Sequence, residues 1–281
     1  MRGKRNFLLF IAALIFIAFE GWMFYLIHLT EDGIPFARYY DCIIAATAFA
    51  WLTLFIKLIG AKEEGTLHTV LGIRDGNLLR IAMIFTLVAD YYLVAAEVEN
   101  QTMGVTVFIG TQLFIFLHII VNDNNKKWKL ANLTVRLALM VIAVIAAFTI
   151  LGDQADYLSI ISVIYYASLC SNLIFAHRSG GGGIVLTIGL LLFALCDINV
   201  GLTALNDIFV GGFPEGSLIY LLVNSEYDLR WLFYIPSQTL IPLTLLFTKN
   251  NKPKKMEQVF PVPFLFDKSA KHYNSVAIKN G

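Results

Sequence analysis

Two aspartates stand in the middle of apolar segments that are long enough to cross a membrane. Asp90 lies within residues 78–98, and Asp197 lies within residues 184–205. A carboxylate in the hydrocarbon region of a bilayer costs at least about 2.5 kcal/mol, so such residues usually face a polar cavity and have a function there. Paired carboxyl groups suit proton transfer, with one as general acid and the other as general base. Asp90 and Asp197 are therefore the predicted catalytic residues.

Further polar side chains in other apolar segments complete the predicted site. As substrate-binding or orienting groups we expect Gln112, His118, Tyr166, Tyr234 and Gln238. Each has a structural alternative, because a polar side chain in a membrane also holds two helices together through a hydrogen bond. Tyr165 and Tyr166 are equally compatible with packing aromatics, and Glu20 in the first segment either joins the site or faces outward.

The elements that must position these residues are transmembrane helices. The chain has 281 residues, of which 58% are hydrophobic and only 15% charged, outside the usual range of a soluble domain. Each crossing needs about 20 apolar residues. Eight segments qualify: residues 7–30, 42–59, 78–98, 103–121, 133–151, 157–175, 184–205 and 229–247. We predict an all-α integral membrane protein, an eight-helix bundle with a buried polar cavity over residues 1–249.

The distribution of basic residues predicts the orientation of this bundle. Of the 21 lysines and arginines, 19 fall at the N-terminus, in or at the edges of every second connection, or at the C-terminal end. This count includes Arg136, just inside the fifth segment. The opposite side keeps Arg38 and Arg230 among many acidic residues. Basic connections remain cytoplasmic, so both termini are expected in the cytoplasm. Residues 250–281 form a basic cytoplasmic tail that either lies along an anionic leaflet or is disordered.

Several other sequence features argue against particular classes of protein and of functional site. The first apolar segment continues through Gly21 and Trp22 without a cleavage site, so we interpret it as a retained span. The three cysteines have no metal-binding or redox spacing, and soluble-enzyme motifs are absent from the sequence. We therefore predict no metal or other cofactor. The charge pattern also predicts no nucleic-acid partner. The run 179–183, with four consecutive glycines, is expected to be a flexible hinge.

Helix rise places the main candidates in one layer. Asp90 and Asp197 lie 12 and 13 residues from the cytoplasmic ends of their segments, or about 18 to 20 Å deep. Tyr234 lies 13 residues from the cytoplasmic end of the eighth segment, with Gln238 one helical turn below it. These four side chains are therefore expected to line one cavity.

At these residues the sequence resembles the lysoplasmalogenase family of eight-span membrane proteins, called YhhN-like in bacteria. The motif residues are Ala89, Asp90 and Leu93; Phe108, Gly110, Phe114 and His118; Gly189, Phe193, Cys196 and Asp197; and Tyr234, Gln238, Leu240 and Ile241. Ala89, Cys196 and Val121 depart from the Gly, Ser and Tyr that are usual in the family. These departures bear on helix packing and substrate choice.

The resemblance implies hydrolysis of the alkenyl ether bond of lysoplasmalogens, a class of lysophospholipid, to a fatty aldehyde and a glycerophospho-alcohol. One aspartate would protonate the alkene and the other would activate water. Which aspartate is the acid and which is the base stays open. Tyr234 and Gln238 would orient the water or the ether oxygen, and His118 would help bind the headgroup phosphate. The expected partners are a lysophospholipid-like substrate and membrane lipids.

Two other classes of function remain open. Intramembrane carboxylates also form proton relays, so a proton-coupled transporter of a small molecule or lipid is the second hypothesis. The third is a non-enzymatic lipid-binding or scaffold protein, in which the aspartates only fix helix packing.

Overall fold

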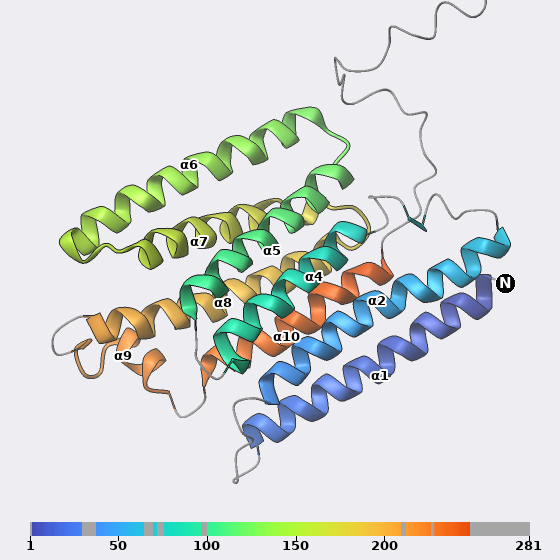
Figure 1. Ribbon diagram of the computed structural model, residues 1–281, viewed down its shortest axis with the longest axis horizontal. Helices are drawn as coiled ribbons and strands as arrows, with labels where there is room; N and C mark the ends of the chain where they lie inside the picture. Colours follow the sequence, from blue (N-terminus) through green and yellow to red (C-terminus); the bar gives the residue numbers. More distant parts are fainter. Residues whose placement is uncertain are drawn as a thin grey trace, which may run out of the picture. The chain divides into compact units, whose positions relative to one another are not determined.

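The computed structural model describes residues 2–29, 38–64, 70–71, 76–96, 100–208, 212–225 and 228–247, and this part of the chain contains no β-strand. The predicted tail, residues 250–281, lies outside the described residues. The helices shown in Figure 1 are α1 (Arg2–Leu29), α2 (Tyr39–Glu64), α4 (Asn77–Asp90), α5 (Gln101–Asn122), α6 (Lys126–Leu151), α7 (Tyr157–Phe175), α8 (Gly183–Ile208), α9 (Leu218–Val223) and α10 (Leu229–Leu243).

Within the described residues, seven helices are long and apolar enough to cross a membrane: α1, α2, α4 with its continuation to Ala95, and α5 to α8. The prediction of an all-α, multi-pass integral membrane protein is confirmed. The predicted eighth segment is also helical, but α10 has 15 residues and contains Pro236 and Pro242. A 3₁₀ turn over Thr244–Leu246 continues it.

Side-chain caps fix the starts of three helices in the middle of the chain. The side chains of Asn100, Asn125 and Asp156 accept hydrogen bonds from backbone N–H groups in the first turns of α5, α6 and α7, respectively. Such caps satisfy N–H groups that have no partner within the helix. They allow short connections, so that consecutive helices run back along one another.

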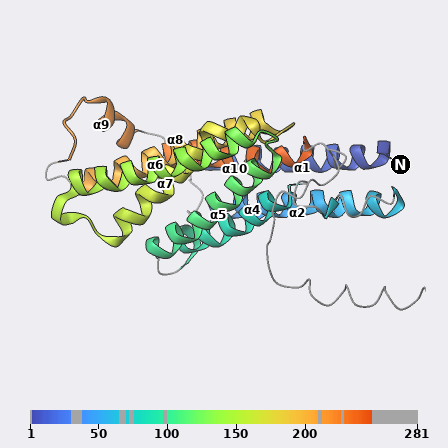
Figure 2. The ribbon, with the colours of Figure 1, turned by 90° about the horizontal axis from the view of Figure 1, so that it is seen from above.

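The helices pack in a definite order across the membrane domain. α8 pairs with α10, α4 pairs with α5, and α7 lies between α5 and α6 (Figures 1 and 2). α1 packs on α2, at the side away from α6. The apolar core joins residues of α1, α2, α4, α5, α7, α8 and α10, whereas α6 buries little of its surface beyond Asn132, Arg136 and Ala147. α6 is therefore a peripheral helix with a partly polar inner side.

The pairing of α8 with α10 depends on close backbone approach at Gly189. A Cβ atom at this position would lie 3.0 Å from Cγ1 of Ile241 and 3.3 Å from its backbone nitrogen. Small residues permit such approach between membrane helices. The absence of a side chain at Gly189 thus lets α10 lie beside the helix that carries Asp197.

The glycine-rich run before α8 forms a compact turn. Gly180 has a φ of 91°, and the Gly183 N–H donates to the Gly180 carbonyl at 3.0 Å. A Cβ atom on Gly183 would lie 2.5 Å from the backbone carbonyl oxygen of His177. The turn therefore requires glycine for space, in addition to any role as a hinge.

We expect Gly183→Ala to destabilise the folded protein by about 1–3 kcal/mol, because the His177 backbone must move. Gly201→Ala is the matched control, since Gly201 is also in α8 and a Cβ there meets no atom within 4 Å. Alanine favours helix over glycine, so this variant should be at least as stable as the parent. Thermal unfolding in detergent measures both, and equal stability of the two variants would contradict the packing argument.

Candidate functional site in the membrane domain

Each of the two aspartates accepts a hydrogen bond from a tyrosine on another helix. The Tyr165 hydroxyl on α7 donates to Oδ2 of Asp197 on α8 at 2.6 Å. The Tyr234 hydroxyl on α10 donates to Oδ2 of Asp90, which is 3% exposed at the end of α4. Neither Oδ1 atom makes a hydrogen bond within the described residues. Each carboxyl group is thus oriented through one oxygen and keeps the other available.

Aromatic rings connect the two Asp–Tyr pairs. The Phe193 ring lies 5.5 Å from Tyr234 and 5.7 Å from Phe108, and the Phe108 ring lies 5.6 Å from Tyr165, between ring centroids. These separations are those of packed aromatic pairs. The two pairs therefore belong to one site formed by α4, α5, α7, α8 and α10.

The backbone changes its geometry directly after Asp90. α4 continues as a π-helical turn over Tyr91–Ala95, and the Asn100 N–H donates to the Tyr92 carbonyl at 3.0 Å. Wider turns of this kind occur often at functional sites, because they change the direction of side chains relative to a regular helix. This turn adjusts the end of α4 at the position of the carboxyl group, and hydropathy gave no signal for it.

Gln238 lies one helical turn from Tyr234, as predicted from its spacing. Its side chain is buried, and Oε1 has no hydrogen-bond partner within the described residues. Its Nε2 lies 3.5 Å from the Ser237 hydroxyl, at the outer limit of a hydrogen bond. Gln238 thus has an unused hydrogen-bond acceptor one helical turn from Tyr234. The structure shows no direct hydrogen bond from Gln238 to either aspartate.

Tyr165, rather than its neighbour Tyr166, binds Asp197. The Tyr166 hydroxyl lies instead beside the Cys170 thiol, one turn along the same helix. The difference is one of helical phase, since consecutive residues are separated by about 100° around the axis. Tyr165 and Tyr166 lie at nearly the same depth in the membrane, so depth alone does not show which of them contacts Asp197.

His118 and Gln112 lie apart from the Asp–Tyr pairs. His118 is buried, with Nδ1 3.3 Å from the Asn122 amide and Nε2 without a partner within the described residues. Gln112 receives a hydrogen bond from Asn172 at 2.9 Å. The Asn172 side chain also contacts the Arg136 guanidinium. Arg136 was counted with the loop charges in the sequence, but it lies ten residues after the start of α6.

In the described part of the chain, the cysteine and carboxylate side chains do not gather into a metal-binding group. Cys42, Cys170 and Cys196 are free thiols. No group of three His, Cys, Asp or Glu side chains among the searched residues is placed to hold a metal ion. Glu20 is buried near Cys42 and Thr239, between α1, α2 and α10, and not beside either aspartate. The carboxyl groups of Asp90 and Asp197, each hydrogen-bonded to a tyrosine, are groups that can transfer protons.

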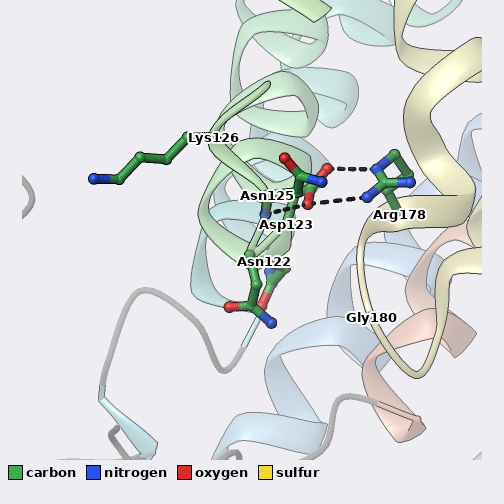
Figure 3. Close-up of a pocket in the computed structure, with 7 residues that line it drawn as sticks. Asn122, Asp123, Asn125, Lys126, Arg178 and Gly180 are labelled. Carbon is green, nitrogen blue, oxygen red and sulfur yellow. Dashed lines mark hydrogen bonds and ion pairs between the residues drawn. The ribbon is translucent and has the colours of Figure 1, made fainter. Parts of the chain in front are cut away.

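A separate pocket of about 520 Å³ lies where the α5–α6 and α7–α8 connections meet. Its lining residues are Asn122, Asp123, Asn124, Asn125, Lys126, Arg178 and Gly180. Figure 3 shows the Asp123 carboxylate directed at Arg178, while Lys126 points away. Nε of Arg178 donates to Oδ2 of Asp123 at 2.6 Å. The predicted cavity at the aspartates is not this pocket, whose lining includes neither of them.

Comparison of the chain with protein-family models, with curated proteins and with solved structures finds no match.

The Asp123–Arg178 ion pair should make stability depend on pH. Burial raises the pKa of Asp123, but hydrogen bonds from Arg178 and the Asn125 N–H, together with nearby positive charge, lower it more, to a net value below 3.8. A depressed pKa in the folded state stabilises it above the unfolded-state pKa, and this stabilisation is lost as pH falls through the folded-state value. Asp123→Asn should therefore unfold at a lower temperature than the parent at pH 7.

The difference in Tm between Asp123→Asn and the parent should shrink as the pH is lowered from about 5 to about 3, because the parent then loses the same charge. Thermal unfolding of both proteins across this range measures the effect. A Tm difference that is constant with pH would show that the carboxylate charge is not the source of the stabilisation.

Proposed function

We propose that the protein is a membrane hydrolase that cleaves the alkenyl ether bond of lysoplasmalogen-type lysophospholipids, releasing a fatty aldehyde and a glycerophospho-alcohol. The observation that supports this proposal is the pair of membrane-embedded aspartates, each oriented by a tyrosine and both within one aromatic cluster. Two carboxyl groups in one site can divide the roles of acid and base. The family resemblance of the surrounding motifs points to the same reaction.

The chemistry requires a proton donor, a water molecule and a proton acceptor. A protonated aspartate would transfer its proton to the alkene carbon beta to the ether oxygen, forming an oxocarbenium ion. The second, ionised aspartate would stabilise this cation and take a proton from the water that attacks it. In the resulting hemiacetal, the second aspartate, now protonated, would donate its proton to the glycerol oxygen, and the first would take the hydroxyl proton. The bond between carbon and the glycerol oxygen then breaks, which releases the alcohol and the aldehyde and restores both carboxyl groups.

The tyrosines act in this scheme by positioning the carboxyl groups. Each tyrosine holds Oδ2 of its aspartate, so that Oδ1 faces the reacting atoms. The rings of Phe108 and Phe193 lie between the two pairs and would exclude bulk water from the apolar alkenyl chain. Gln238 has a free Oε1 within the described residues and would orient the attacking water.

We propose that α10 is the eighth span and that both termini are cytoplasmic. α10 and its 3₁₀ continuation together rise about 28 Å, which approaches the thickness of the hydrocarbon core. Tyr234, near its centre, is hydrogen-bonded to Asp90 on α4. An even number of spans agrees with the alternation of basic and acidic connections.

A proton-coupled transporter is the second candidate, and the π-helical turn after Asp90 favours it. Transporters often carry irregular helices beside the residues that bind substrate or ions. Sealed vesicles containing the protein would then accumulate substrate without bond cleavage. A scaffold protein would instead show no activity in the parent and a loss of stability on replacement of either aspartate.

Asp90→Asn and Asp197→Asn should each lower the turnover of a vinyl-ether lysolipid by at least about 100-fold, because each removes a proton-transferring group. Tyr165→Phe and Tyr234→Phe should lower it by about 10-fold, because the carboxyl group loses its orienting hydrogen bond. Aldehyde release by the purified protein in detergent is the measurement. Asp156→Asn, at an exposed helix cap, is the control and should keep parental turnover.

Wild-type turnover by folded Asp90→Asn and Asp197→Asn proteins would refute the mechanism. A saturated ether analogue of the lysolipid provides a substrate control, since it has no alkene to protonate and should release no aldehyde.

The orientation predicts that a fluorescent protein fused to the C-terminus is fluorescent in a bacterial host and that alkaline phosphatase fused there is inactive. Fluorescent protein folds in the cytoplasm, whereas the phosphatase needs disulfides that form outside it. The reverse pattern would place the C-terminus outside and give an odd number of spans with a cytoplasmic N-terminus.

A further inference from the structure

Arg136 is a buried cation within the membrane domain. It lies ten residues after the start of α6, about 15 Å along the helix, and its side chain is 6% exposed. Its guanidinium carbon lies 4.1 Å from the centroid of the Phe116 ring on α5. Within the described part of the chain, no carboxylate forms an ion pair with Arg136. A buried charge of this kind normally has a partner of opposite sign.

Arg136, Asn172 and Gln112 form a chain of hydrogen bonds in which each side chain donates to the next. Arg136 Nη2 donates to Oδ1 of Asn172, and Nδ2 of Asn172 donates to both the backbone carbonyl and Oε1 of Gln112, each at 2.9 Å. The side-chain carbonyl groups of Asn172 and Gln112 are thus occupied as acceptors. Among the described residues, Nε of Arg136 and Nε2 of Gln112 have no acceptor. The cluster has unused donors and a positive charge, so an anionic acceptor is its chemical complement.

Joining α6 to α7 does not require this charge. One turn earlier on α6, Asn132 accepts a hydrogen bond from the Ser171 hydroxyl at 3.2 Å, which links the same two helices through neutral groups. α6 buries few residues, yet two of them are Asn132 and Arg136. A neutral pair thus already links α6 and α7, so the pairing of these helices does not by itself account for a buried cation.

We propose that Arg136 and Gln112 bind the phosphate group of a lysophospholipid. The anionic chemistry follows from the unused donors, whereas the choice of a lipid phosphate rests on the proposed hydrolase function. Asn172 lies seven residues from Tyr165 on α7, so the donor cluster is about 10 Å along that helix from the partner of Asp197. This separation suits the few bonds between a sn-1 ether oxygen and the headgroup phosphate. Arg136, rather than His118, is thus the principal phosphate-binding residue.

The test uses a ligand that cannot be hydrolysed. A saturated 1-O-alkyl glycerol phosphate and the matching 1-O-alkyl glycerol differ only in the phosphate, and native mass spectrometry of the full chain in detergent measures the binding of each. The parent should prefer the phosphate lipid, and Arg136→Gln should bind it about 10- to 100-fold more weakly. Binding of the phosphate-free lipid should not change.

Two further variants separate recognition from structure. Asn132→Ala removes the neutral link between α6 and α7 and should leave the preference for phosphate intact. Gln112→Glu places a carboxylate at the end of the hydrogen-bond chain, which should neutralise Arg136, raise the Tm and abolish the preference. If Arg136→Gln does not fold, the binding preference of Gln112→Glu still tests the proposal.

Inorganic phosphate distinguishes the source of the anion. Competition by millimolar inorganic phosphate against the lipid would indicate a site for the free ion, whereas binding that also needs the alkyl chain indicates a headgroup. Equal binding of the two lipids by the parent, or an unchanged preference in both Arg136→Gln and Gln112→Glu, would overturn the proposal. Because the probe has no vinyl ether, a lack of aldehyde release would refute the hydrolase without affecting this result.

Discussion

The cost of a polar group in hydrocarbon is the constraint on which this structure depends. No water is available in the bilayer core to satisfy an exposed carboxylate, amide or guanidinium group. The aspartates meet this constraint through tyrosines on other helices, and Asn172 meets it by bridging α5 and α6. Each such bond links two helices at a defined pair of residues. The polar groups therefore add specific contacts to the apolar packing at the centre of the domain.

Two polar layers result, and they differ in chemical character. The layer with Asp90 and Asp197 consists of acids and phenol groups, whereas the layer with Gln112, Arg136 and Asn172 has a surplus of hydrogen-bond donors. α5 and α7 contribute to both layers, through Phe108 and Gln112 on α5 and through Tyr165 and Asn172 on α7. An amphiphile with an anionic headgroup and a reactive bond a short distance away would match this division of chemistry.

The sequence predicted the positions of the apolar helices well, because long apolar runs are strong signals in a membrane protein. It also singled out Asp90 and Asp197 as isolated charges in such runs, and their catalytic role stays a prediction. It did not predict the partner of Asp197. Tyr165 and Tyr166 differ by one residue in depth but by about 100° in direction, and direction depends on how α7 packs. The π-helical turn after Asp90 had no sequence signal, because it leaves hydropathy unchanged. The sequence placed Arg136 just inside the fifth segment, but α6 begins seven residues before that segment, at Lys126, so Arg136 lies farther from the start of its helix than predicted.

The position of Arg136 depends on contacts at the end of α6. Arg178 binds Asp123 and also lies over the Trp128 ring at 4.7 Å, and Trp128 packs against Phe175 at the end of α7. Trp128, Asn132 and Arg136 follow one another at intervals of four residues, so they share one side of α6. A slip of α6 by one residue would turn this side by about 100° and direct the guanidinium toward lipid. The contacts of Trp128 with Arg178 and Phe175 therefore favour the register in which Arg136 faces Asn172.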